Sequence, residues 1–144
     1  MTEEMHRTLI EQFCETVGLP DAEKLRANGT LLVDGFQVQL LRNIYCDGLL
    51  DIRVDLGAVP VERERDAYRT MLEINMITSA SHAGQIGVVS GEGGDGHAIF
   101  SVGMPVTTYT TGDDVAHTLD HVLKQAEYVR DAVNGSSGNG EARP

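Results

Sequence analysis

The sequence VERERDAYRTMLEINMITSA, residues 61–80, predicts one long helix. Pro60 precedes it where a helix can begin, and Glu62 and Glu64 place negative charge near the positive helix end. At about 100° per residue, its mainly apolar positions cover an arc roughly 200° wide. These positions are Ala67, Tyr68, Met71, Leu72, Ile74, Asn75 and Met76. Because one surface contact needs a narrower stripe, we expect the helix either to be fully buried in the core or to pack against a second subunit.

The size of the chain favours a single domain. It has 144 residues, of which 41% are hydrophobic and 23% are charged, as in ordinary soluble globular proteins. We predict one domain over residues 1–133. The remaining residues, 134–144, read NGSSGNGEARP, and this Gly- and Ser-rich composition predicts a disordered tail.

The charge of the chain limits its partners. The 22 acidic and 11 basic residues give a formal net charge of −11. Phosphate backbones and anionic membranes would repel such a surface, so nucleic-acid and membrane binding are disfavoured and a basic partner is favoured. No basic start leads into an apolar run and no stretch resembles a membrane span, so we expect a cytoplasmic protein. Cys14 and Cys46 form no CxxC pair and are predicted to be reduced core residues.

Around the central helix, hydrophobic periodicity predicts the other elements. Residues 3–17 form a first helix, followed by a polar connection over residues 21–29. Residues 30–33 predict a strand, and a two-residue turn at Asp34-Gly35 leads into a second strand. Residues 50–56 predict a third strand, because apolar and charged residues alternate there most clearly. Short turns join these strands, so they should form an antiparallel meander with one apolar face.

A second hairpin and a last helix complete the prediction. Residues 85–89 and 98–104 predict two further strands, and a helix begins near Gly112. The core stripe of this helix is Val115, Leu119, Val122, Ala126, Val129 and Val133. The fold class is therefore α+β, in the order helix, three-strand meander, helix, two-strand hairpin, helix.

Two local motifs suggest chemistry, and their context argues against it. Gly91, Gly93 and Gly96 satisfy a literal GxGxxG, but this loop joins two strands and carries Glu92 and Asp95 where a phosphate would sit. We interpret it as a hairpin connection.

His117 and His121 stand one helical turn apart, a spacing that can place two imidazoles on one zinc ion. They face away from the core stripe and no third ligand is evident nearby, so the pattern favours a solvated helix face. His6, His82 and His97 are isolated, and no role is assigned to them.

No sequence motif predicts an enzyme. GxSxG, HExxH and P-loop motifs are absent, and the plentiful carboxylates are explained by an acidic surface. We predict no catalytic residues, no metal site and no cofactor. A small enzyme with an unrecognised site is kept as the third hypothesis for the function.

Several segments of the chain, spread over residues 9–133, resemble the CesT-like (Tir chaperone) family of bacterial type III secretion chaperones. The segments are VGLP at 17–20, VDGFQVQL at 33–40, LGAVP at 56–60, MLEINM at 71–76, GQIGV at 84–88 and VGMPV at 102–106. The resemblance implies a homodimeric, ATP-independent cytoplasmic chaperone of a virulence system. Such a protein would hold the N-terminal chaperone-binding segment of a secreted effector in extended form.

The resemblance also implies two sets of contact residues. The dimer interface would comprise Ala67, Tyr68, Met71, Leu72, Asn75 and Met76 of the central helix. Effector contacts, with strand addition at a sheet edge, would come from Phe13, Leu31, Val33, Leu41, Ile44 and Leu49. The secretion ATPase is a further partner to test. A dimeric peptide-binding or regulatory module of the same fold, outside secretion, is the second hypothesis.

Overall fold

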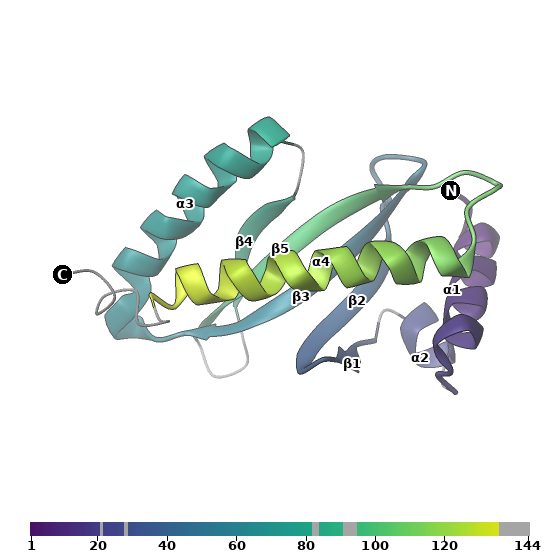
Figure 1. Cartoon of the computed structure of the whole chain (residues 1–144), viewed down its shortest axis with the longest axis horizontal. Coiled ribbons are helices and arrows are strands. Elements are labelled where there is room, and N and C mark those ends of the chain that lie inside the picture. The colour runs from purple at the N-terminus through teal and green to yellow at the C-terminus, as the bar shows by residue number, and fades with distance from the viewer. Residues whose placement is uncertain (21, 28, 82–83, 91–94, 136–144) are drawn as a thin grey trace. The chain divides into compact units, whose positions relative to one another are not determined.

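The computed structural model of the chain describes residues 1–20, 22–27, 29–81, 84–90 and 95–135. Its elements, shown in Figure 1, are α1 (Glu3–Val17), α2 (Ala22–Arg26), β1 (Leu31–Val33), β2 (Phe36–Arg42), β3 (Leu49–Val59), η1 (Val61–Arg63), α3 (Glu64–Ser81), β4 (Gln85–Ser90), β5 (Gly96–Pro105) and α4 (Gly112–Val133). The strands form one five-stranded sheet in the order β1-β2-β3-β5-β4. The predicted α+β class is confirmed. The short helix α2 is a correction, because residues 21–29 were expected to form only a polar connection.

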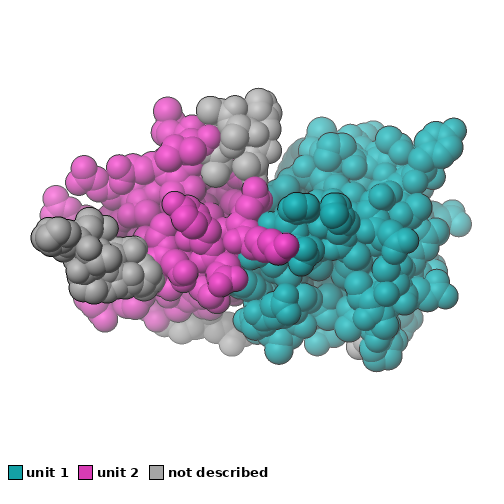
Figure 2. Space-filling view, viewed as in Figure 1, with its two compact units in different colours: residues 1–54, 102–123 teal, residues 55–101, 124–144 magenta. Residues whose placement is uncertain are grey.

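The chain divides into two compact units, coloured separately in Figure 2. Unit 1 comprises residues 1–54 and 102–123, and unit 2 comprises residues 55–101 and 124–144. Strands β3 and β5 and helix α4 contribute residues to both units. The single domain over residues 1–133 stays a prediction. So does the disordered tail, since residues 136–144 lie outside the described residues.

In unit 1, the predicted hairpin between β1 and β2 is present. Asp34 and Gly35 both have positive φ, 50° and 84°, as a two-residue turn of this handedness requires. The register places Val33 opposite Phe36 across that turn. Phe36, Val38 and Leu40 are buried along β2, where they alternate with the more exposed Gln37 and Gln39.

His6 of α1 has a structural role that its isolated position in the sequence did not reveal. Its Nε2 atom lies 3.1 Å from the carbonyl oxygen of Leu40. Burial lowers the pKa of His6, so the neutral ring is favoured. Because a carbonyl oxygen only accepts, Nε2 carries the hydrogen and joins α1 to β2.

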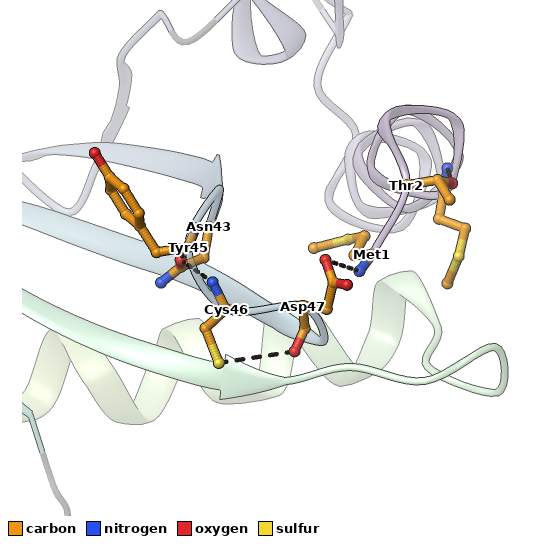
Figure 3. Close-up of polar contacts among 7 residues, drawn as sticks. Met1, Thr2, Asn43, Tyr45, Cys46 and Asp47 are labelled. Atoms are coloured by element: carbon orange, nitrogen blue, oxygen red, sulfur yellow. Dashed lines mark hydrogen bonds and ion pairs between the residues drawn. The ribbon is translucent and has the colours of Figure 1, made fainter.

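The prediction for the cysteines is half wrong. Cys14 is buried in α1, whereas Cys46 is exposed in the turn between β2 and β3, and neither of the two forms a disulfide. Asn43 accounts for this turn, because its Oδ1 accepts hydrogen bonds of 2.8 Å from the backbone N–H groups of Tyr45 and Cys46. Figure 3 shows the Cys46 Sγ atom directed toward the carbonyl oxygen of its neighbour Asp47.

In unit 2, helix α3 is not fully buried, which excludes one of the two alternatives for it. Ala67 and Met71 are buried, while Leu72, Met76 and Ile77 are 68%, 76% and 70% exposed. In the neighbouring hairpin, Ile86 of β4 is buried but Val88 is 44% exposed, so buried and exposed residues do not alternate regularly along β4.

Two polar contacts organise unit 2. His97 of β5 lies with Nδ1 3.1 Å from both carboxylate oxygens of Asp55 on β3, and one of those oxygens also accepts from the Gly57 N–H. Asn75 of α3 binds both backbone groups of Ile86, donating to its carbonyl at 2.9 Å and accepting from its N–H at 2.7 Å. Asn75 therefore connects α3 to the edge strand β4.

Asn75→Ala is expected to lower the free energy of unfolding by about 2–4 kcal/mol, since two backbone groups of Ile86 lose their partner. Urea denaturation measures this loss. Glu73→Ala, an exposed site on the same helix, is the matched control and should change stability little. Equal effects of the two substitutions would contradict the role assigned to Asn75.

Candidate functional site

An apolar groove lies in unit 1 between the C-terminal part of α1, strand β1 and helix α4. It encloses about 380 Å³. Its lining residues are Phe13, Val17, Leu19, Leu31, Leu32, Val33, Asp34, Ala116, Leu119, Asp120 and Leu123. Phe13 is only 1% exposed, whereas Leu32 is 70% exposed. The groove therefore combines a well-packed wall with an accessible apolar side chain.

Strand β1 forms one edge of the sheet and lines this groove. Val33 and Phe36 flank a two-residue turn, so they form a hydrogen-bonded pair, and the next pair, Leu32 with Gln37, is not hydrogen-bonded. The N–H and C=O groups of Leu32 therefore point away from β2, toward the open edge. Leu32 presents both a backbone pairing site and an apolar side chain.

The charged side chains that line the groove are both acidic, Asp34 and Asp120. Asp34 is exposed at the turn that follows β1, and the chain as a whole carries a formal charge of −11. A segment that combines apolar residues with a basic residue would match this lining better than an acidic one.

A second hollow lies at the turn between β2 and β3. It encloses about 330 Å³, and we call its lining the tip patch: Leu41, Arg42, Asn43, Ile44, Tyr45, Asp51 and Arg53. Asn43 holds this turn by its two backbone contacts and by donating from Nδ2 to Asp51 at 3.2 Å (Figure 3 shows the turn). Ile44 and Tyr45 project from it, and Tyr45 is 94% exposed.

The residues predicted to contact an effector fall in three places. Phe13, Leu31 and Val33 line the groove, and Leu41 and Ile44 line the tip patch. Leu49 lines neither and lies beside Gly103 of β5. The sequence did not single out Leu32, which stands within an apolar run where periodicity alone does not show which side chain is exposed.

The residues predicted for the dimer interface are also divided by the structure. Ala67 and Met71 are buried within the chain, and Asn75 is bound to β4. Tyr68 is half-buried and donates to Glu64 at 3.3 Å. Only Leu72 and Met76 of that set are exposed apolar residues, and Ile77, which was not predicted, adjoins Met76. The face of α3 that is both apolar and exposed is therefore narrower than the arc predicted from the sequence.

Metal ligands, membrane-spanning helices and the GxGxxG segment were also considered in the sequence. Within the described ranges, no group of three or more His, Cys, Asp or Glu side chains is placed to hold a metal ion. In that same part of the chain, none of the helices is both long and apolar enough to span a bilayer. Most of the GxGxxG segment, residues 91–94, lies outside the described residues.

Comparison with known proteins identifies the family. Residues 8–130 match the Tir chaperone protein (CesT) family. A chain in the crystal structure of the ExsC–ExsE complex shares the fold, with 21% identity and a TM-score of 0.57 over 90% of this chain and 93% of that one. No curated protein matches the sequence. Because the family match covers most of the chain, the protein belongs to the Tir chaperone protein (CesT) family.

Proposed function

We propose that this protein is a cytoplasmic type III secretion chaperone. It would bind the N-terminal chaperone-binding segment of an effector and keep it extended without using ATP. Membership of the Tir chaperone protein family supports this function, and so does the fact that the structurally similar chain comes from the ExsC–ExsE complex. The observation that carries the proposal is the apolar groove beside the open edge of β1.

In this proposal the effector segment pairs with Leu32 through its backbone and places alternate side chains into the groove. The apolar side chains of the segment would lie against the wall formed by Phe13 and Leu119. A basic residue near Asp34 would be favoured by charge. Binding an extended chain in this way needs no catalytic group, which agrees with the non-enzymatic character of the family.

The proposal also includes a homodimer formed through α3. Leu72 and Met76 stand one helical turn apart and are both exposed, so they form a continuous apolar strip with Ile77 beside it. Large apolar side chains that a monomer leaves exposed in one place are typical of an interface. A second copy of the chain would cover this strip.

Leu32→Asp is expected to weaken binding of the effector's N-terminal segment by roughly 10- to 100-fold, since it puts a charge into an apolar contact. Isothermal titration calorimetry with the purified segment measures the affinity. Because Leu32 is exposed, the fold should be unaffected. Tyr109→Asp, at an exposed site that does not line the groove, is the matched control and should bind normally. Equal affinities of both variants would exclude the groove.

To identify the effector, proteins that co-purify with this chain from the native cell and the products of the neighbouring genes should be examined. If neither an effector nor the secretion apparatus is associated with the protein, a dimeric peptide-binding or regulatory module becomes the better hypothesis. Turnover of a metabolite that is lost on substituting a groove residue would favour the small enzyme. Co-purification with the secretion ATPase would add that partner.

A further inference from the structure

We propose that α4 carries a binding site for a divalent transition metal ion, formed by His117 and His121. The two imidazole rings are in contact, with centroids 4.9 Å apart and planes at 83° to each other. Both side chains are exposed. This inference does not depend on the proposed function, because neither residue lines the groove or the tip patch.

Helix geometry supports the site. Side chains four residues apart have Cβ atoms about 5–6 Å apart on one face of a helix, which allows two imidazole nitrogens to reach one ion at about 2.0–2.1 Å. The opposite face of α4 is fixed, since Val115, Leu119 and Val122 are buried. The helix backbone is therefore held by packing, while the two exposed histidine side chains are left to turn toward an ion. The other coordination positions would be filled by water or by a ligand from a partner.

Nearby charge favours a cation at this position. Asp113 and Asp114 lie in the first turn of α4, one turn before His117. Both carboxylates are exposed, and Asp114 also accepts a hydrogen bond from the backbone N–H of Thr111 at 2.8 Å. Lys124, one turn beyond His121, carries the opposite charge but already interacts within the chain. The chain's formal charge of −11 adds a general attraction for cations.

The ligand type predicts which ions bind. Imidazole nitrogens suit Cu²⁺, Ni²⁺ and Zn²⁺, whereas Mg²⁺ and Ca²⁺ prefer oxygen ligands. Cu²⁺ should bind more tightly than Ni²⁺ or Zn²⁺.

The test is calorimetric titration of the untagged full chain with NiCl₂, in the presence of excess MgCl₂. We expect one Ni²⁺ per chain. His117→Asn and His121→Asn should each lower the affinity roughly tenfold or more, because each leaves a single imidazole. His97→Asn, which removes a histidine paired with Asp55, is the control and should bind as the wild type does.

Moving one histidine along the helix tests whether the affinity depends on the spacing of the two histidines or only on their number. In the double variant His121→Asn/Gln125→His, two imidazoles are kept but stand eight residues, about 12 Å, apart along the helix. This variant should bind as weakly as His121→Asn. Wild-type affinity in the relocated variant, displacement of Ni²⁺ by Mg²⁺, or no binding at millimolar Ni²⁺ would each overturn the proposal.

Discussion

Gly112→Ala is expected to lower the free energy of unfolding by about 3 kcal/mol, because α4 begins in close contact with α1. A Cβ atom at Gly112 would lie 2.4 Å from the carbonyl carbon of Gln12, 2.5 Å from its oxygen and 2.6 Å from the nitrogen of Phe13. These are backbone atoms inside a helix, so they cannot rotate away. One helix must shift, and the packing of both is disturbed.

Urea denaturation of Gly112→Ala measures the effect, and Gly87→Ala is the matched control. Gly87 lies in β4, and a Cβ there would meet no atom within 4 Å. The control should retain stability within about 1 kcal/mol of the wild type. Similar unfolding midpoints for the two variants would show that α1 and α4 do not approach as closely as described.

Binding of the effector segment gives a second measure of the contact between α1 and the start of α4. Phe13, beside Gln12 on α1, lines the groove, and α4 supplies Ala116 and Leu119 to it. A shift of either helix should therefore change the groove as well as the stability. In a Gly112→Ala protein that remains folded at low temperature, weaker binding of the effector segment is expected.

Leu72→Asp/Met76→Asp is expected to convert the proposed dimer into a monomer. Placing a charge at a buried contact without a partner costs about 3–5 kcal/mol, which raises the dissociation constant by a factor of roughly 100 or more. Both side chains are exposed within one chain, so the fold of the monomer should survive. Light scattering should give twice the chain mass of 15.6 kDa for the wild type and a single chain mass for the variant.

The choice of residue decides whether this experiment is informative. Met71→Asp would place a charge at a site that is buried within the chain, so loss of the dimer could follow simply from unfolding. Val61→Asp is the matched control, since Val61 is an exposed apolar residue in η1, outside α3. A wild type that is monomeric at micromolar concentration would refute the interface.

The exposed strip of α3 and the apolar groove belong to different units, unit 2 and unit 1, so the two functions can be tested separately. Leu32→Asp should weaken peptide binding and leave the mass unchanged. Leu72→Asp/Met76→Asp should lower the mass measured by light scattering. Retention of peptide binding by that monomer would show that one chain supplies the whole binding surface.

Local periodicity was sufficient for most elements of the fold. The alternation of Leu50, Ile52 and Val54 is found as buried positions of β3, because a strand exposes every second residue to the same face. Every residue of the predicted core stripe of α4, from Val115 to Val133, is buried, because residues three or four apart lie on the same face of a helix. Asp34-Gly35 specified its turn, since few residue pairs tolerate two positive φ angles.

The tertiary structure decided which of the apolar residues remain available to partners. The sequence assigned Met71 and Leu72 to the same face of α3, yet only Leu72 is exposed, because burial depends on what the rest of the chain places against the helix. Asn75 was predicted as a subunit contact, and its pairing with Ile86 depends on how α3 packs on β4. Leu32 gains its position from the order of the strands, which leaves β1 at an edge. Amino-acid periodicity is a local property of the chain, whereas exposure and edge position arise from contacts between segments distant in sequence.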